Sequence, residues 1–320
     1  MTENKVIFVT GTGRSGTNIF KEVLSNHSRV ATLPFEYRFT VDPRGVFDFY
    51  NTFPSIWTPY WADAKIKDLE SFLLSLAERS ADDNLNFGDN SKTTPAPYSG
   101  WELNKWIPNY ERFVNELISE LVEYKYNSRW PGTAQGIENN QMYFSKNMSQ
   151  KELISPLSIF LNSCFSSICA TGSKDFLVED NTHSMLFAKS INEIIPRGKL
   201  AHIIRDPRDV IASLVTQRWA PKDLEACTTW YLEVIHKWFE QRSLIPDSFY
   251  TEIRFEDLVN KTSNTLEAFA AWSGIDTQKS MLEVDLSKSN IGRHKSQFTR
   301  REKSNLDSRL ASILEDYSYI

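Results

Sequence analysis

Three things that this 320-residue chain lacks limit what it can be: an excess of positive charge, a cysteine framework and a long apolar run. The net charge of −5 argues against a protein that covers nucleic-acid phosphates with a basic face. The three cysteines, Cys164, Cys169 and Cys227, are too few for a disulfide framework, and their spacing matches no zinc motif. We therefore expect no nucleic-acid partner and no metal, and any anion site must be local.

The sequence also lacks the marks of export or membrane insertion. No basic leader with an apolar core precedes the first apolar run, and no apolar run of about 18 residues follows it. Since so few cysteines suit a reducing compartment, we expect a cytoplasmic protein with no membrane insertion.

Apolar runs and amphipathic patterns alternate along most of the chain. Continuous apolar runs, typical of buried parallel strands, occur at residues 6–9, 176–179, 200–205 and 249–255. Helical patterns with apolar residues three and four apart follow, at residues 17–25, 207–217 and 264–272. This order predicts one α/β domain over residues 1–320, a three-layer fold with a central parallel sheet flanked by helices.

Residues 45–170 have a different composition, rich in Pro, Asn, Ser and aromatic residues, with helix-like stretches at 68–80 and 110–124. Five of the nine tryptophans lie here: Trp57, Trp61, Trp101, Trp106 and Trp130. We interpret the region as a mostly helical insertion that forms the acceptor pocket, although tryptophans often pack in a core. Residues 218–238 form another aromatic-rich helical stretch that could line the core, the mouth of the site or a homodimer face.

The first apolar run leads into a glycine-rich loop, GTGRSG, at residues 11–16. Glycines between a strand and a helix let backbone N–H groups converge on an anion at the helix N-terminus. The loop has the glycine spacing of a nucleotide-triphosphate loop, but Thr17 and Asn18 replace its Lys and Ser/Thr. Arg14 can bind two oxygens of a tetrahedral anion without a metal. The loop therefore predicts a P-loop-like anion site that needs no magnesium.

A second anion-binding pattern follows the run at 200–205. Arg205 ends the predicted strand, Asp206 is a candidate N-cap, and Pro207 suits the first position of a helix. Ser213 lies on that helix, so it and Arg205 can face the crevice where open α/β sheets bind ligands. A second phosphate would fit there.

Three segments, GTGRSGTN, IIRDPRDVIASL and IRFEDLV, together and in this order resemble the sulfotransferases that use 3′-phosphoadenosine 5′-phosphosulfate (PAPS). The resemblance is to the bacterial small-molecule type, and it implies transfer of a sulfuryl group without a metal. It implies that the first loop binds the 5′-phosphosulfate, through Gly13, Arg14, Ser15, Gly16, Thr17 and Asn18. It implies that the 3′-phosphate is bound by Arg205, Ser213, Arg293 and Lys295.

The same resemblance offers two candidates for the general base. Glu36 and Arg38 reproduce the Glu-x-Arg pattern of the bacterial and tyrosylprotein branches, where the glutamate is the base. His183 lies where the cytosolic branch carries its catalytic histidine. We favour Glu36 as base, and expect Arg38 and His183 near the acceptor. The family lysine expected at residues 178–182 is missing, so either Arg14 acts alone or a basic residue from elsewhere replaces it.

The acceptor is the least constrained part of the prediction. Residues 41–130 contain 14 acidic and 9 basic residues, which favours a cationic small molecule, such as a guanidinium alkaloid in natural product biosynthesis. A carbohydrate, lipid or phenol is an alternative acceptor. Two other functions share parts of the pattern: a P-loop small-molecule kinase, and a non-catalytic nucleotide-binding protein.

Overall fold

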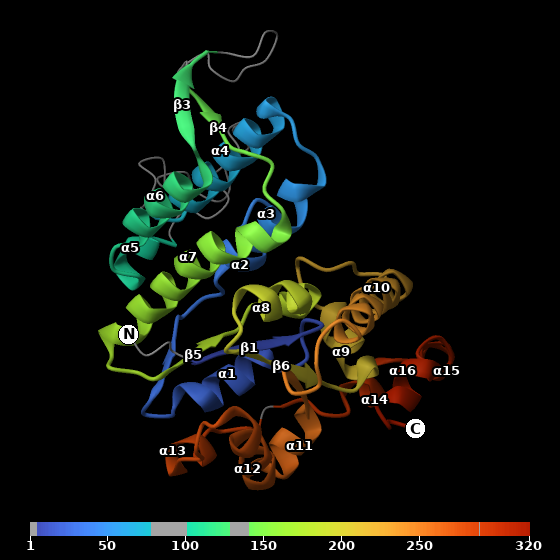
Figure 1. The fold of residues 1–320 in the computed structure, drawn as a ribbon. Helices are drawn as coiled ribbons and strands as arrows, with labels where there is room; N and C mark the ends of the chain where they lie inside the picture. The colour runs from blue at the N-terminus through green and yellow to red at the C-terminus, as the bar shows by residue number, and fades with distance from the viewer. Residues whose placement is uncertain (1–4, 78–100, 129–140, 288) are drawn as a thin grey trace, which may run out of the picture. The chain divides into compact units, whose positions relative to one another are not determined.

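The computed structural model describes residues 5–77, 101–128, 141–287 and 289–320 (Figure 1). Trp130 and the parts of the predicted insertion at 78–100 and 129–140 lie outside the described residues. The chain divides into two compact units. The sheet unit comprises Lys5–Glu36, Lys174–Asn192 and Arg197–Ile320, and the helical unit comprises Tyr37–Ser173 and Glu193–Pro196.

A five-stranded parallel sheet forms the centre of the sheet unit. Its strand order is β2 (Val30–Thr32), β5 (Phe176–Glu179), β1 (Lys5–Gly11), β6 (Gly198–Ile204) and β7 (Tyr250–Arg254). The four predicted strands are confirmed, and the parallel sheet with its flanking helices confirms the predicted fold class. The carboxyl ends of β1, β5 and β6 lie side by side, so the loops that follow them share one edge of the sheet.

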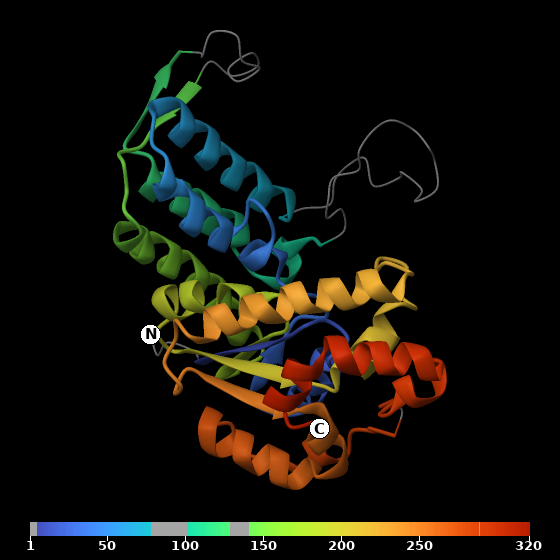
Figure 2. The ribbon, with the colours of Figure 1, turned by 90° about the vertical axis from the view of Figure 1, so that its right-hand side faces the viewer.

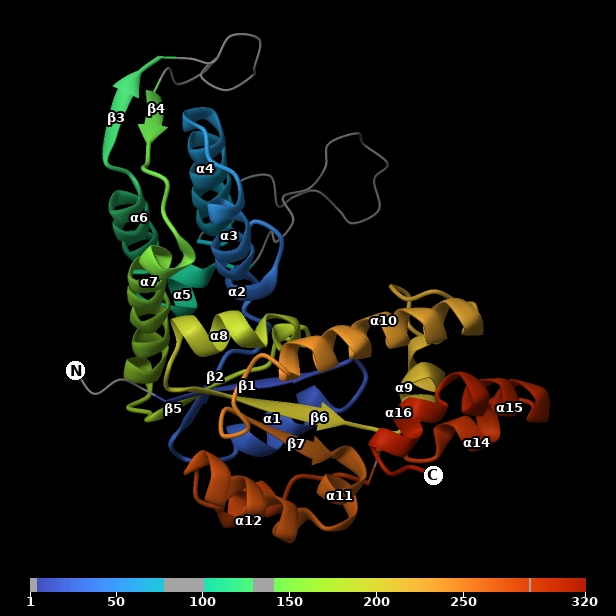
Figure 3. The same cartoon turned by 45° about the vertical axis from the view of Figure 1, so that its right-hand side comes forward.

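Helices cover both faces of this sheet (Figures 1 and 3). One face is covered by α1 (Thr17–Ser25), α11 (Phe255–Asn260), α12 (Thr262–Ser273) and α13 (Lys279–Leu282). Their apolar side chains pack on the strands in one buried cluster, with Phe20 against Phe269 at a ring distance of 5.0 Å. The predicted helix at 17–25 is therefore confirmed, and so is that at 264–272.

The other face is covered by α10 (Leu224–Arg242), which Figure 2 shows alongside the C-terminal helices. Trp238 of α10 is fully buried against His202, at a ring distance of 4.6 Å, and donates a hydrogen bond to Glu252 at 3.0 Å. The aromatic stretch at 218–238 thus contributes its last tryptophan to the core. The remaining helices of this unit are η2 (Ser184–Phe187), α9 (Pro207–Leu214), α14 (Arg293–Gln297), α15 (Arg300–Arg309) and α16 (Ala311–Asp316).

The predicted helix at 207–217 was too long, because α9 ends at Leu214. Thr216 and Gln217 donate side-chain hydrogen bonds to the carbonyl of Ser213, at 2.8 and 3.2 Å. These polar side chains satisfy the last carbonyls of the helix and turn the chain away.

The helical unit contains α2 (Arg38–Val41), α3 (Val46–Thr52), η1 (Phe53–Ser55), α4 (Pro59–Ser75), α5 (Leu103–Trp106), α6 (Tyr110–Leu121) and α7 (Gln150–Thr171). An antiparallel pair that the sequence did not predict, β3 (Tyr124–Asn127) and β4 (Gln141–Phe144), follows α6. A short helix shared between the two units, α8 (Ala188–Ile194), precedes β6.

Helix α7 corrects the expectation that no long apolar run occurs. Over 18 of its residues the mean hydropathy is 1.6, which by length and composition alone is sufficient for a membrane span. The run was missed because serines and an asparagine interrupt it. One stripe of the helix, including Leu153, Leu157 and Leu161, is buried, as in the core helix of a folded unit.

None of the four described tryptophans of the predicted insertion is fully buried: Trp57, Trp61 and Trp101 are half-buried and Trp106 is exposed. A cavity of about 340 Å³ in the helical unit contains none of them in its wall. Its lining residues are Glu70, Asn115, Ile118, Ser119, Val122, Glu123, Tyr124 and Lys125. That the insertion forms the acceptor pocket stays a prediction.

Candidate functional site

The glycine-rich loop between β1 and α1 takes a conformation that few residues tolerate. Gly13, Arg14 and Gly16 all have positive φ, at 78°, 60° and 108°. At Gly16 a Cβ atom would lie 2.3 Å from the Phe255 ring, so both the backbone and the space require glycine. Left-handed residues in a loop can turn successive backbone N–H groups toward one side, as in the anion nests of phosphate-binding loops.

The N-terminus of α1 is open to an anion. Gly16 is its N-cap and supplies no side-chain hydrogen bond, and the first turn carries no acidic residue. Ser15 is 1% exposed, and its Oγ has no hydrogen-bond partner among the described residues. Since buried polar atoms are nearly always paired, this hydroxyl and the free helix end both point to a bound group. Thr17 is buried at the start of the helix, and Asn18 is exposed.

The end of β6 is built as the sequence predicted. Asp206 is the N-cap of α9, accepting a hydrogen bond from the Arg208 N–H at 2.9 Å, and Pro207 is the first helical residue. Arg205, immediately before this cap, is only 8% exposed. It donates to the Arg14 carbonyl at 3.2 Å, which fixes it beside the loop.

The structure brings three guanidinium groups together. Burial lowers the pKa of Arg205, and the nearby charges of Arg14 and Arg293 lower it further, whereas Asp209 and Glu256 oppose the shift. The Arg205 Nε has no hydrogen-bond partner within the described part of the chain. Cations that repel one another, and that include an N–H donor without a partner, are suited to bind an anion with more than one negative charge.

A direct hydrogen bond joins the two predicted phosphate sites. The Arg14 Nε donates to the Ser213 Oγ at 3.0 Å, across 199 residues of sequence. The loop after β1 and the helix after β6 thus form one continuous polar site in the sheet unit.

The two candidates near the C-terminus differ in position. Arg293, the first residue of α14, is half-buried and donates to Gln297 at 2.7 Å. Lys295 is exposed. The charge of Arg293 contributes to the lowered pKa of Arg205, so we define Arg14, Arg205 and Arg293 as the cation cluster.

Glu36 lies against the segment that follows β5. Its Oε1 accepts a hydrogen bond from the Thr182 hydroxyl at 3.2 Å. The Thr182 carbonyl accepts from the Gly11 N–H at 3.1 Å and from the Thr10 hydroxyl at 2.7 Å. A single residue, Thr182, therefore connects Glu36 to the start of the anion loop.

The other two residues expected near the acceptor differ in position. His183 is exposed next to Thr182, and its N–H donates to Asn181 at 3.2 Å. Arg38 lies in the helical unit, where it pairs with Asp42 at 3.4 Å.

Sequence reasoning missed an acidic cluster of Glu36, Glu179 and Asp180, and the lysine that accompanies it. Burial raises the pKa of both Glu179 and Asp180, and the charge of Glu36 adds to both shifts. Lys21 of α1 pairs with Asp180 at 2.9 Å and is 14% exposed. It lies four residues after Thr17, hence on the same helix face, which is the signal that could have identified it.

Lys174, the other lysine near the missing family position, is excluded by strand direction. It precedes β5, and its ammonium donates to the Ser28 carbonyl at 2.6 Å. It therefore lies at the amino end of the strand, whereas the anion loop lies at the carboxyl end.

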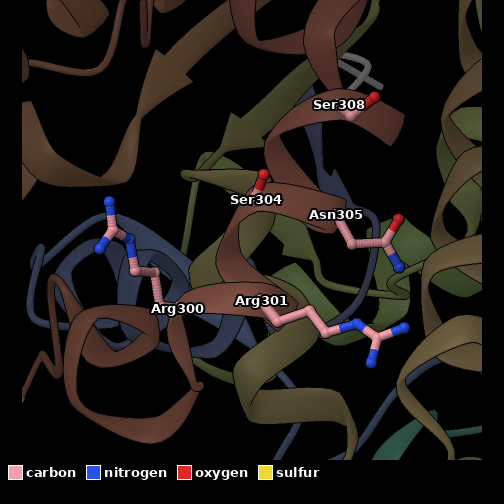
Figure 4. Close-up of a pocket in the computed structure, with 5 residues that line it drawn as sticks. All are labelled: Arg300, Arg301, Ser304, Asn305 and Ser308. Carbon is pink, nitrogen blue, oxygen red and sulfur yellow. The ribbon is translucent and has the colours of Figure 1, made fainter.

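A surface groove of about 660 Å³ lies along α15, lined by Arg300, Arg301, Ser304, Asn305 and Ser308. Figure 4 shows that the side chains of Arg300 and Arg301 point away from each other. They do not converge on one anion, and we assign them no site. The described residues contain no group of three or more His, Cys, Asp or Glu side chains that could hold a metal ion.

A parallel sheet whose first strand leads through a glycine-rich loop into a helix defines a P-loop-like α/β protein. The model of the sulfotransferase family matches residues 76–279, which is more than half of the chain. The chain therefore belongs to the sulfotransferase family, as the three segments implied. A comparison with curated protein sequences gives no match.

The solved structures that match this chain include three sulfotransferases. STF9 from Mycobacterium avium is 10% identical, with a TM-score of 0.46 over 99% of this chain and 77% of that one. STF1 from Mycobacterium tuberculosis H37Rv is 13% identical, with a TM-score of 0.46 over 97% of this chain and 77% of that one. The sulfotransferase domain from the curacin biosynthetic pathway is 13% identical, with a TM-score of 0.42 over 96% of this chain and 97% of that one.

Proposed function

We propose that this sulfotransferase moves a sulfuryl group from PAPS to a hydroxyl or amine of a small molecule and releases 3′,5′-adenosine bisphosphate. The observation that carries the proposal is the joining of two anion sites through Arg14 and Ser213. A donor with phosphate groups at both its 5′ and 3′ positions needs two such sites at one edge of the sheet. A nucleoside triphosphate does not need the second anion site.

The residues of the loop would bind and stabilise the phosphosulfate end of the donor. Charge develops on the leaving phosphate oxygen during sulfuryl transfer, as it does in phosphoryl transfer. The guanidinium of Arg14, the N–H groups of residues 13–18 and the positive end of α1 would stabilise that charge, and the left-handed loop before α1 supports this role. Arg205, Ser213 and Arg293 would bind the 3′-phosphate, with Lys295 as an outer contact.

Glu36 is the proposed general base, and it would take the proton of the acceptor hydroxyl or amine. The hydrogen bond from Thr182 restricts the orientation of its carboxylate, and the bonds of Thr182 to Thr10 and Gly11 tie it to the donor loop. His183 is the alternative base and is otherwise proposed to contact the acceptor together with Arg38. A positioned base contributes about 10²- to 10⁴-fold to the rate.

For the acceptor we propose a cationic small molecule, supported by the acidic excess of residues 41–130 and by the carboxylates of Glu36 and Asp180. A guanidinium alkaloid has this character, and a carbohydrate or a phenol is the alternative. We further propose that residues 45–170 supply the acceptor pocket and that the protein acts in the cytoplasm.

Calorimetry tests the donor. We expect 3′,5′-adenosine bisphosphate to bind in the presence of a chelator, and ATP to bind weakly with or without magnesium. Preference for magnesium-ATP would identify a kinase and overturn the proposal. Tight binding of the bisphosphate without turnover of any member of a panel of amines, alcohols, phenols and sugars would identify a non-catalytic binding protein.

A further inference from the structure

A buried aspartate fixes the segment that carries Arg293. Asp209, in the first turn of α9, is 1% exposed. Its carboxylate accepts hydrogen bonds from the Gly292 N–H at 2.6 Å and from the His294 N–H at 2.9 Å. The His294 Nδ1 lies 2.6 Å from the same carboxylate and, because a carboxylate only accepts, must donate its proton to it. Three donors from one short segment thus converge on one side chain.

Arg205 holds the beginning of the same segment. Its Nη2 donates to the Asn290 carbonyl at 2.8 Å and to the Ser289 carbonyl at 3.3 Å. Gln297, at the end of α14, donates to the Ala212 carbonyl on α9 at 2.8 Å. Residues 289–297, which we call the basic segment, are therefore attached to β6 and α9 at their start, middle and end.

The backbone of the basic segment turns through two left-handed residues. Asn290 and Gly292 both have positive φ, at 56° and 77°. Glycine and asparagine are the residues that tolerate this conformation best, so the sequence allows the turn that the bonds of Arg205 and Asp209 fix. Arg293 lies between Gly292 and His294, the two residues that Asp209 binds, so the bonds of Asp209 fix the position of its Cα.

We propose that Asp209 and His294 are positioning residues that hold Arg293 at the 3′-phosphate end of the donor site. The inference rests on the proposed function, because it assigns a role toward the 3′-phosphate of its donor. Neither residue contacts the nucleotide. They contribute by ordering Arg293 before binding, so that the ordering cost is not taken from the binding free energy. Without them the donor site would keep Arg14 and the loop but lose specificity for the 3′-phosphate.

The test compares two nucleotides that differ in the 3′-phosphate alone: 3′,5′-adenosine bisphosphate and 5′-AMP. Asp209→Ala removes all three bonds together with the 3.9 Å ion pair to Arg205, whereas His294→Phe removes only the side-chain bond and keeps a ring of similar size. His294→Asn is the conservative variant, since its amide can donate where Nδ1 does. Asp307→Asn is the matched control, because Asp307 is an aspartate that pairs with Arg208, at 2.9 Å, and is 51% exposed.

We expect Asp209→Ala to weaken bisphosphate binding about 10- to 100-fold, which is the loss expected for charged hydrogen bonds. His294→Phe should weaken it less, and His294→Asn should restore most of it. AMP binding should change less than about twofold in all variants, and Asp307→Asn should bind both nucleotides as the unchanged protein does. Hydrogen exchange should show faster exchange of the Gly292 and His294 amides in Asp209→Ala.

Four outcomes are decisive. Selective loss of bisphosphate affinity with faster exchange in the basic segment supports the inference. Equal weakening of AMP and bisphosphate, or full bisphosphate affinity despite faster exchange, overturns it and gives Asp209 a purely structural role. If the unchanged protein itself does not prefer bisphosphate to AMP, the proposed donor is wrong, and this result is distinguishable because it needs no variant.

Discussion

Two clusters of charge at the same edge of the sheet differ in how their charges are compensated. In the cation cluster of Arg14, Arg205 and Arg293, the hydrogen-bond acceptors are backbone carbonyls and neutral side chains, and the buried Asp209 carboxylate lies 3.9 Å from Arg205. The Arg205 Nε has no hydrogen-bond partner among the described residues. The acidic cluster of Glu36, Glu179 and Asp180 is compensated by Lys21 and by hydroxyl donors.

This difference indicates which of the two clusters is suited to bind a negatively charged ligand. Burial and like-charge repulsion lower the pKa of Arg205, and the charge of a bound anion would raise it again. Burial raises the pKa of Glu179 and Asp180, so that cluster favours protons or cations. One side of the edge is therefore suited to the donor phosphates and the other to the acceptor and its proton.

The largest effect is expected on the acidic side. Glu36→Gln keeps the shape of the side chain and its bond from Thr182 but removes the base, so turnover should fall about 10²- to 10⁴-fold. The dissociation constant of 3′,5′-adenosine bisphosphate should be unchanged in calorimetry. Near-normal turnover would move the role of base to His183, for which His183→Gln is the companion variant.

On the cation side, Arg205→Ala should act in the opposite way. It removes a buried charge from the donor site, and bisphosphate affinity should fall about 100-fold or more, as for a truncated partner of a buried charge pair. Saturating donor should recover much of the turnover. A selective loss of turnover with intact donor affinity would show that the two sides are not separate.

The sequence predicted the cation side better than the acidic side, for a physical reason. Arg14, Arg205 and Ser213 lie within short motifs whose spacing sets where a strand ends and a helix begins, so their approach follows from the parallel sheet. The partnership of Lys21 with Asp180 joins a helix to a distant strand end, and no local pattern fixes it.

The strands and helices, too, could be predicted where a local sequence pattern marks them and not where it does not. Continuous apolar runs predicted four strands of the sheet, whereas the polar pair β3 and β4 carried no such signal. The length of α7 was missed because serines hide an apolar stripe that is visible only in three dimensions.

A smaller effect is expected from Lys21→Met, which keeps the bulk of the side chain and removes its charge. Asp180 would lose its 2.9 Å partner beside Glu36, so the acidic cluster should hold protons more tightly. We expect turnover at neutral pH to fall about tenfold, since one pKa unit corresponds to a tenfold change, with recovery as the pH rises. A pH–rate profile identical to that of the unchanged protein would show that Lys21 is only structural.

The smallest effect is on stability, at Glu252, which lies outside both clusters. Burial alone would raise its pKa, but hydrogen bonds from His202 and Trp238 and the charge of Arg242 hold the pKa at about 2. A lowered pKa stabilises the fold above the ordinary carboxyl pKa, and that contribution is lost as the pH falls toward 2.

Glu252→Gln should therefore lower the free energy of unfolding by about 1.5 to 3 kcal/mol at neutral pH, as measured by urea unfolding. The difference from the unchanged protein should shrink in acid. A difference independent of pH would mean that packing against Trp238, and not the charge, is what matters.

The central claim is that one site at this edge binds a donor through both its 5′ and 3′ phosphates without a metal. Its most direct test is calorimetric titration of 3′,5′-adenosine bisphosphate into the unchanged protein and into Arg205→Ala, both with chelator present. The account predicts tight binding to the unchanged protein and about 100-fold weaker binding to the variant. Equal affinity of the two proteins, or binding that requires magnesium, would contradict it.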